Sequence, residues 1–179
     1  MTSSFAPSLS HLGIFCHDVD QLAAFYCEVF DMIETDRGQG ITMPYRLVFL
    51  SGSPGQHHQL VLASSRPADT PSTVMQLSFK VQSLDHLREA RRRALQRGAS
   101  RMRGLNHGNA LSIYFSDPED NTVEVYLDTP WYVTQPHGDP LDLERSDADI
   151  WAETERICRA DPTFILVSEW SATFARPQR

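Results

Sequence analysis

The chain has 179 residues, of which 41% are hydrophobic and 22% charged, so it is long enough to bury a sizeable core and too apolar for wholesale disorder. Its formal net charge of −7 at pH 7 argues against nucleic acids and anionic membranes as partners, because both favour a basic surface. No apolar run approaches the roughly 18 residues of a membrane helix, and residues 1–10 lack the basic and apolar regions of a signal peptide. We therefore expect a cytoplasmic protein.

The cysteines agree with that compartment. Cys16, Cys27 and Cys158 are an odd number and have no CxxC spacing. This usage is typical of reduced, mostly buried thiols and not of a disulfide framework.

The first half of the chain begins with an alternating strand at residues 11–16, followed by the turn HDVD and a helix. The helix is predicted by hydrophobic residues at helical spacing, namely Leu22, Phe25, Tyr26, Val29 and Phe30. A loop and further strands follow, among them RLVFLS at 46–51 and HQLVLA at 58–63.

The second half repeats the first at a spacing of 65 residues without a gap. HLGIFCHDVDQL, from residue 11, aligns with QLSFKVQSLDHL, from residue 76; the same offset aligns RLVFLS with LSIYFS (111–116) and HQLVLA with VEVYLD (123–128). A second helix is predicted by Leu84, Leu87, Ala90, Ala94 and Leu95, with Gly98 at its C-terminal cap. One offset that serves three separate segments indicates an internal duplication.

These elements predict an α+β fold of two paired βαβββ modules that form a cup-shaped mixed sheet, with an added C-terminal helical arm. Module one covers residues 9–65 and module two covers 74–130, within a domain that spans 1–133. In each strand, the residues that alternate with the hydrophobic row point into the cup.

The arm, residues 134–179, contains one predicted helix. Ser146 is its N-cap, Asp147 and Asp149 lie in its first turn, Ile150, Trp151, Thr154 and Ile157 share one face, and Pro162 follows its end. The arm is expected to pack on the domain. The last stretch, from residue 163, is compatible with a strand or with a partner-binding tail.

Glu124 indicates where a function lies, because it interrupts the apolar strand TVEVYL, and a buried carboxylate needs a cation or a proton. The repeat pairs His11 with Gln76 and Gln59 with Glu124, and its symmetry directs all four side chains to one interior point. An imidazole and a carboxylate with open positions suit a divalent metal such as Fe(II), Mn(II), Ni(II) or Zn(II). The plain alternative is that His11 caps a strand and Glu124 pairs with an arginine such as Arg46.

The duplicated modules and the segment NHGNALSIYFSDPEDNTVEVY resemble the vicinal-oxygen-chelate superfamily, which includes glyoxalases, bleomycin- and fosfomycin-resistance proteins and type I extradiol dioxygenases. The segment is most similar to the extradiol signature, in which a His, an apolar residue with Tyr, and an acidic residue with Pro precede a Glu ligand. Those positions are His107, Ile113, Tyr114, Asp117, Pro118 and Glu124. Leu105 and Asp120 depart from the signature, which has a small or β-branched residue and a Gly or Pro there.

The resemblance implies a set of metal ligands, His11, Gln76, Glu124 and Gln59. Two of them depart from the known subfamilies. Extradiol enzymes carry a second His where Gln76 stands, and glyoxalases that use a Gln ligand carry a second Glu where Gln59 stands. The ion is expected to be Fe(II), with Mn(II), Ni(II) or Zn(II) as alternatives, and a metal-free protein stays open.

The resemblance also implies catalytic roles. His107 and Tyr114 would hydrogen-bond a catecholate oxygen, and His58 would shuttle a proton during the attack of O₂, a task that suits an imidazole. The implied protein is an extradiol ring-cleavage dioxygenase that acts on a small aromatic substrate, and it is expected to form a homodimer. Each residue also has a structural alternative: a solvated loop for His58, a turn for His107 and the core for Tyr114.

Two other functions stay open. One is a glyoxalase-like isomerase, lyase or transferase of the same superfamily that acts on another substrate with vicinal oxygens. The other is a metal-free protein, similar to bleomycin-resistance proteins, that binds a small molecule.

Two further segments are interpreted structurally. The basic run REARRRALQRGASRMR is predicted to be a solvated helix face. The sequence DPED at 117–120 lacks the rest of a calcium loop and is predicted to form a turn.

Overall fold

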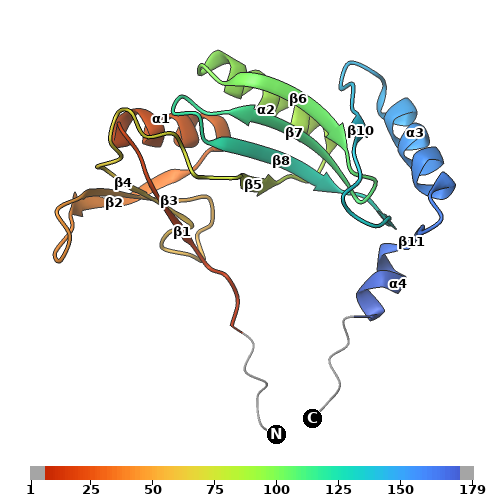
Figure 1. The fold of residues 1–179 in the computed structure, drawn as a ribbon, viewed down its shortest axis with the longest axis horizontal. Coiled ribbons are helices and arrows are strands. Elements are labelled where there is room, and N and C mark those ends of the chain that lie inside the picture. Colours follow the sequence, from red (N-terminus) through yellow and green to blue (C-terminus); the bar gives the residue numbers. More distant parts are fainter. Residues whose placement is uncertain (1–6, 174–179) are drawn as a thin grey trace, which may run out of the picture. The chain divides into compact units, whose positions relative to one another are not determined.

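The computed structural model of the chain describes residues 7–173. The chain divides into two compact units, Met1–Thr73 (unit 1) and Val74–Arg179 (unit 2). Each unit contains a mixed β-sheet and at least one helix (Figure 1), which confirms the predicted α+β fold. Part of the N-terminal segment without signal-peptide features, 1–6, and the end of the predicted arm, 174–179, lie outside the described residues.

Residues 7–73 of unit 1 form one helix and a four-stranded sheet. Its elements are β1 (Leu12–Phe15), α1 (Val19–Phe30), β2 (Ile33–Gln39), β3 (Arg46–Ser51) and β4 (Leu60–Ala63). The strand order is β1-β4-β3-β2, in which β1 and β4 run parallel and the other pairs run antiparallel.

Unit 2 repeats this arrangement. Its elements are β5 (Leu77–Lys80), α2 (Leu84–Gln96), β6 (Ser100–Asn106), β7 (Ala110–Ser116) and β8 (Thr122–Asp128). The order β5-β8-β7-β6, with β5 parallel to β8, is the same as in unit 1, and the short strand β10 (Asp139–Pro140) extends the sheet beside β6. The duplication predicted from the 65-residue offset is therefore confirmed at the level of topology.

Both helices begin at side-chain caps and bury the predicted face. The Asp18 carboxylate accepts backbone N–H bonds at the start of α1, and the Ser83 hydroxyl does so for α2. In α2 the buried residues are Leu84, Leu87, Ala90 and Ala94. The prediction was wrong for Leu95, which is 48% exposed because it lies beside the buried stripe, near the end of the helix.

The sheet of unit 2 has an apolar and a polar face. Helix α2 packs on the apolar face, which carries Leu111, Ile113, Phe115, Val123 and Val125, all buried (Figure 1). The alternate residues of β7 and β8, among them Tyr114 and Glu124, lie on the opposite face. The alternation of the strands thus directs the candidate site away from the helix.

The C-terminal elements form a second small core within unit 2. They are β9 (Trp131–Tyr132), α3 (Asp147–Ala160), β11 (Ile165–Leu166) and α4 (Val167–Ala172). Trp131, Val133 and Cys158 are buried together, with Trp151 and Phe164 packed against them. The final stretch contains both a short strand and a helix.

The predicted cap of α3 is confirmed, because Ser146 Oγ accepts from the Asp149 N–H. Its buried face differs from the prediction. Ile150 and Thr154 are buried as expected, but Cys158 is buried in place of Ile157, because 150, 154 and 158 follow a strict four-residue spacing.

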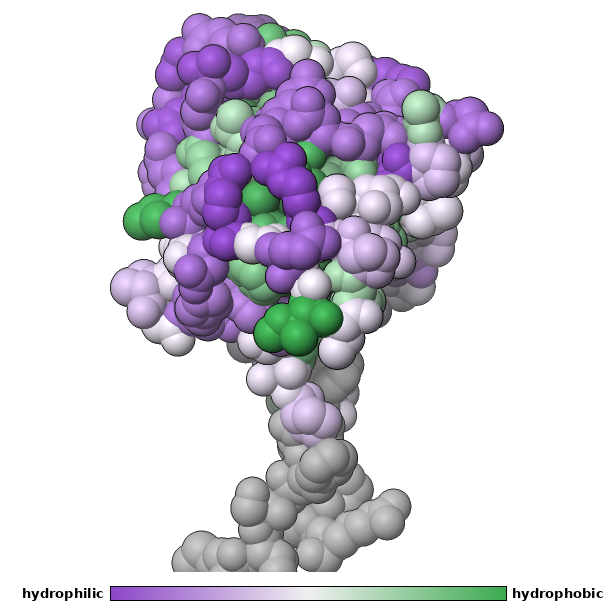
Figure 2. Space-filling model, turned by 90° about the vertical axis from the view of Figure 1, so that its left-hand side faces the viewer, coloured by the Kyte–Doolittle hydropathy of each residue, from purple (hydrophilic) through white to green (hydrophobic). Residues whose placement is uncertain are grey.

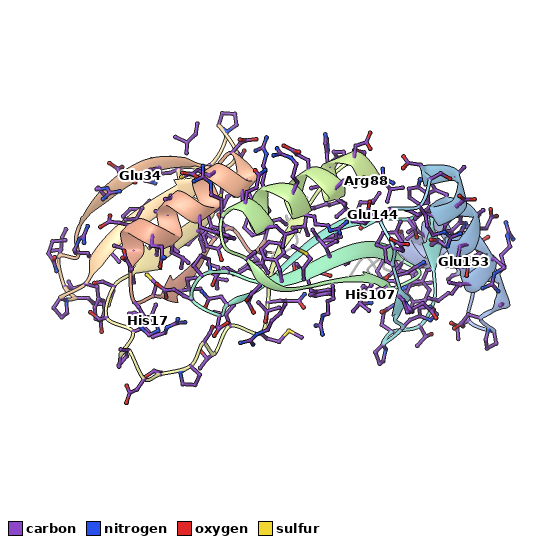
Figure 3. The ribbon with its side chains drawn as sticks, turned by 90° about the horizontal axis from the view of Figure 1, so that it is seen from above. His17, Glu34, Arg88, His107, Glu144 and Glu153 are labelled. Carbon is purple, nitrogen blue, oxygen red and sulfur yellow. The ribbon has the colours of Figure 1, made fainter. Side chains whose placement is uncertain are left out.

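The basic run on α2 was only partly predicted correctly. Arg92 is an exposed residue that pairs with Glu89, as expected for a solvated face. Arg88, however, donates to the carbonyls of Leu143 and Arg145, and Arg91 pairs with Glu144. Figure 3 labels Arg88 on α2 and Glu144 near it. Since guanidinium groups present several donors in a fixed plane, this part of the run anchors the C-terminal segment.

The turn predicted at DPED is present. The buried Asp117 carboxylate accepts from the backbone N–H groups of Glu119 and Asn121 and from the Asn121 amide. Asp120 has a positive φ of 62°, a conformation that Asp tolerates better than most residues. The turn joins β7 to β8 and so fixes the relative register of Tyr114 and Glu124.

Within the described residues, Cys16 and Cys158 are buried, Cys27 is half-buried, and none of the three forms a disulfide, as predicted. The surface in Figure 2 is mainly hydrophilic, and its hydrophobic residues form small separate groups. None of the helices among residues 7–173 has the length and hydrophobicity that crossing a membrane requires.

Candidate functional site

The polar face of unit 2 carries a row of four residues, one from each main strand. Strand register pairs Arg103 with Tyr114, Tyr114 with Glu124, and Glu124 with Ser78. Side chains of paired residues lie about 5 Å apart on the same face. The register therefore brings a cation, a phenol, a carboxylate and a hydroxyl together without any loop.

Glu124 is 8% exposed and accepts four hydrogen bonds. Its Oε2 accepts from Gln76 Nε2 at 2.9 Å and from Ser78 Oγ at 2.7 Å. Its Oε1 accepts from Ser112 Oγ at 3.0 Å and from the Tyr114 hydroxyl. A carboxylate offers about four lone-pair positions, so protein donors occupy both oxygens. The suggested pairing of Glu124 with Arg46 was wrong, because Arg46 pairs with Asp20.

Tyr114 and His107 extend this network. His107 Nε2 lies 3.0 Å from the Tyr114 hydroxyl, and His107 Nδ1 lies 2.6 Å from the carbonyl oxygen of His137. The phenol has one proton but two neighbours that accept, Glu124 and a bare Nε2. The chain His107–Tyr114–Glu124 can therefore hold one more proton, and it can pass a proton along its length.

The surroundings keep Tyr114 in its neutral form. Burial of the phenol, followed by its hydrogen bond to the negative Glu124, raises the pKa of Tyr114 well above its usual value. The Arg103 guanidinium, 5.1 Å from the centre of the Tyr114 ring, acts more weakly in the opposite direction. Tyr114 is accordingly a hydrogen-bond donor over the whole physiological pH range.

An open pocket of about 290 Å³ lies over this network. Its lining is His107, Asn109, Ala110, Tyr114, Glu124, Tyr126, Asp128 and Gln135, all of unit 2. The pocket presents a phenol, an imidazole and a carboxylate to a small molecule, which is the usual chemistry of a site that orients a polar ligand.

Unit 1 holds a separate aromatic group. The rings of His11 and His58 lie 4.3 Å apart, and the Phe49 ring lies 5.2 Å from that of His58. His57 Nδ1 is 2.9 Å from His58 Nδ1, and His57 Nε2 pairs with Asp36. Burial, followed by the charges of His11 and His57, lowers the pKa of His58, so this imidazole is favoured in its neutral, proton-accepting form.

The predicted equivalence of Gln59 and Glu124 was wrong. Leu50 of β3 and Phe115 of β7 are equivalent at the offset of 65. In the sheets, Leu50 pairs with Leu60 and Phe115 pairs with Val123. The equivalent residues of the last strand, Leu60 and Val123, are therefore only 63 positions apart. The residue of unit 1 that occupies the position of Glu124 is therefore Val61. The Gln59 oxygen accepts from the Gly52 N–H at 2.9 Å.

The structure thus brings the predicted residues together in two groups. Gln76, His107, Tyr114 and Glu124 form one network in unit 2, and His11 and His58 are in contact in unit 1. Within the described part of either unit, three or more His, Cys, Asp or Glu side chains do not gather as a metal site.

Sequence reasoning missed two donors to Glu124, Ser78 and Ser112. The signal was available, because Ser78 lies two residues after Gln76 and Ser112 two before Tyr114, on the same faces of their strands. A search for polar partners along each alternating face finds both.

Comparison with known proteins agrees with this architecture. The sequence model of the Glyoxalase/Bleomycin resistance protein/Dioxygenase superfamily matches residues 8–125, and the chain belongs to this superfamily. A search of curated proteins found no match.

Several solved structures share the fold. A fosfomycin resistance protein, FosX, from Listeria monocytogenes, complexed with Mn(II) and sulfate, is 19% identical, with a TM-score of 0.55 over 70% of this chain and 95% of its own. A glyoxylase/bleomycin resistance protein/dioxygenase domain from Frankia sp. EAN1pec is 23% identical, with a TM-score of 0.57 over 69% and 99%. FosX from Mesorhizobium loti is 23% identical, with a TM-score of 0.54 over 70% and 94%.

Proposed function

We propose that the chain is an enzyme that cleaves the ring of a catechol-type aromatic molecule with O₂, in the manner of extradiol dioxygenases. The observation that carries the proposal is the shared pocket of His107, Tyr114 and Glu124, three residues that match the extradiol signature. A pocket of about 290 Å³ suits one small aromatic substrate. A glyoxalase-like isomerase, lyase or transferase is the fallback within the same superfamily.

The reaction requires a divalent metal ion, and the residues fit one in the type of their donor atoms. In unit 2, Gln76 Nε2 lies 2.9 Å from Glu124 Oε2, and the proposal adds the His11 imidazole as a third ligand. Imidazole, amide and carboxylate are ligands of Fe(II) and of its neighbours Mn(II), Ni(II) and Zn(II). The proposed set is His11, Gln76 and Glu124; Gln59 is left out because Val61, and not Gln59, occupies the position of unit 1 that is equivalent to Glu124. The ion would supply chelation of two adjacent substrate oxygens.

The protein side chains would handle the protons. Tyr114, held neutral by its raised pKa, would redirect its one hydroxyl proton from Glu124 to a substrate oxygen, and His107 Nε2 would accept from the substrate. His58, whose lowered pKa favours the neutral imidazole, is the proposed base for a catechol proton.

Turnover provides the first test. Protein loaded anaerobically with Fe(II) and then mixed with 2,3-dihydroxybiphenyl in air should form a yellow ring-cleavage product, followed by absorbance. Tyr114→Phe should lower kcat about 100-fold, because it removes the positioned donor, whereas Tyr132→Phe, in β9, should leave kcat unchanged. Equal rates for both variants would contradict the role of Tyr114, and ligand binding without colour would contradict ring cleavage.

A metal-free small-molecule binding protein is the second candidate, and one observation favours it. Four protein donors fill both oxygens of Glu124, so an ion must replace at least one of these hydrogen bonds. Equilibrium dialysis against Fe(II), Mn(II), Ni(II) and Zn(II) separates the two functions. The enzyme should retain about one ion per chain, and His11→Ala and Glu124→Ala should each abolish retention. Binding of a catechol by a chain that retains no ion would support sequestration instead.

A further inference from the structure

The C-terminal segment contacts His107, the imidazole at the edge of the pocket. In the structure the C-terminal arm begins at Val133, which packs in the C-terminal core, one residue before its predicted start at 134, and it is described as far as residue 173. These residues lie beyond the superfamily match, which ends at residue 125. In Figure 3, His107 lies at the end of the unit 2 sheet where the C-terminal elements begin. A segment outside the common fold that contacts a site residue can give this chain a property of its own.

The arm contacts three consecutive residues, 106–108. Asn106 Nδ2 donates to Thr154 Oγ1 of α3 at 2.9 Å, in a fully buried contact. The backbone of Gly108 packs against Val133 and Cys158. The arm therefore holds the residues before and after His107 in place. This restrains the backbone of His107 and keeps its imidazole at the edge of the pocket.

The arm also binds His107 directly, through one glutamine. Gln135 Nε2 donates to the carbonyl oxygen of His107 at 2.8 Å, and Gln135 Oε1 accepts from the His137 N–H at 3.1 Å. The His137 carbonyl, on the same residue, accepts from His107 Nδ1 at 2.6 Å. The Gln135 amide thus connects the two ends of the hydrogen bond that holds the imidazole.

This hydrogen bond determines where the imidazole carries its proton. A carbonyl oxygen can only accept, so Nδ1 must carry hydrogen. In a neutral imidazole the other nitrogen, Nε2, is then bare, and it is the atom 3.0 Å from the Tyr114 hydroxyl. The arm therefore selects the tautomer that accepts a proton from the pocket side.

We propose that the C-terminal arm completes the pocket and that Gln135 is a positioning residue, which holds His107 in the Nδ1-protonated tautomer with Nε2 facing Tyr114. Gln135 also lines the pocket, next to His107 and Tyr114. The statement about His107 holds for any substrate; only its consequence for turnover rests on the proposed function.

The test reads the tautomer by NMR of protein labelled with ¹⁵N at histidine. Wild-type His107 should show a protonated Nδ1 and a bare Nε2, with slow exchange of the Nδ1 hydrogen. In Gln135→Ala that exchange should be about tenfold faster, the effect of losing one hydrogen bond, and the Nε2 tautomer should become populated. Glu153→Gln, a change at a half-buried residue of α3 that pairs with Arg156, is the control and should leave both signals unchanged.

Two further measurements complete the test. Gln135→Asn keeps the amide but shortens it by one methylene, so it should give an intermediate exchange rate; it also replaces Gln135→Ala should that variant fail to fold. If ring cleavage is the reaction, Gln135→Ala should lower kcat more than it raises KM. An unchanged His107 tautomer and exchange rate in both folded variants would overturn the proposal, whatever the turnover result.

Discussion

Replacing Glu124 with Ala is expected to lower the free energy of unfolding by about 3 kcal/mol. The variant leaves four donors, on Gln76, Ser78, Ser112 and Tyr114, without their common acceptor in a site where Glu124 is 8% exposed. A buried polar group without a partner costs about 1–3 kcal/mol. Ser112 is buried and Gln76 and Tyr114 are half-buried, whereas Ser78 is exposed, so water recovers part of this cost. Urea denaturation at neutral pH measures the change.

The matched control is Asp128→Asn, on the same strand. Asp128 is exposed and pairs with Lys80 at the surface, so its loss should cost less than about 1 kcal/mol. Glu124→Gln, which keeps the shape but turns one acceptor into a donor, should lie between the two. If Glu124→Ala costs no more than Asp128→Asn, Glu124 is not the centre of a cooperative network, and the pocket depends on other contacts.

The fold was predictable because a single offset of 65 residues aligns the two halves of the sequence and so indicates the duplication. Hydrophobic alternation and helical spacing identified the strands and helices of both units, since these patterns follow from which residues face the helix. The offset failed at the last strand, where the connection between β3 and β4 is longer than the one between β7 and β8 by two residues. A change in loop length is invisible to an ungapped alignment, and so Gln59 was matched to Glu124 in place of Val61.

The candidate site was predictable only in part. The signature identified His107, Tyr114 and Glu124, which do share one pocket. The contribution of Gln135 was not predictable, because its contacts depend on how an irregular, proline-containing segment folds back onto the sheet. The two bonds of Arg88 to backbone carbonyls have the same origin. Periodicity describes residues in helices and strands, and long-range contacts of loops leave no such pattern.

Replacing Gly108 with Ala tests the packing of the C-terminal arm against this residue. The substitution should lower the free energy of unfolding by about 3 kcal/mol. Gly108 has a φ of 73°, and a Cβ there would lie 2.5 Å from Cγ2 of Val133 and 3.2 Å from the sulfur of Cys158. The left-handed conformation costs a residue with a side chain about 1 kcal/mol, and overpacking of a buried contact adds about 1–3 kcal/mol. Urea denaturation again provides the measurement.

Gly98→Ala is the control that separates the packing part of this destabilisation from the conformational part. Gly98 also has a positive φ, 86°, but no atom lies within 4 Å of the position of its Cβ. This control should therefore lose only the conformational part, about 1 kcal/mol. Because Val133 and Cys158 belong to the arm, the excess loss in Gly108→Ala measures the contact between the arm and the residue next to His107. If the free energy of unfolding falls equally in the two variants, the arm accommodates the extra methyl group at residue 108. In that case the contact with Gly108 does not hold the imidazole of His107 in place.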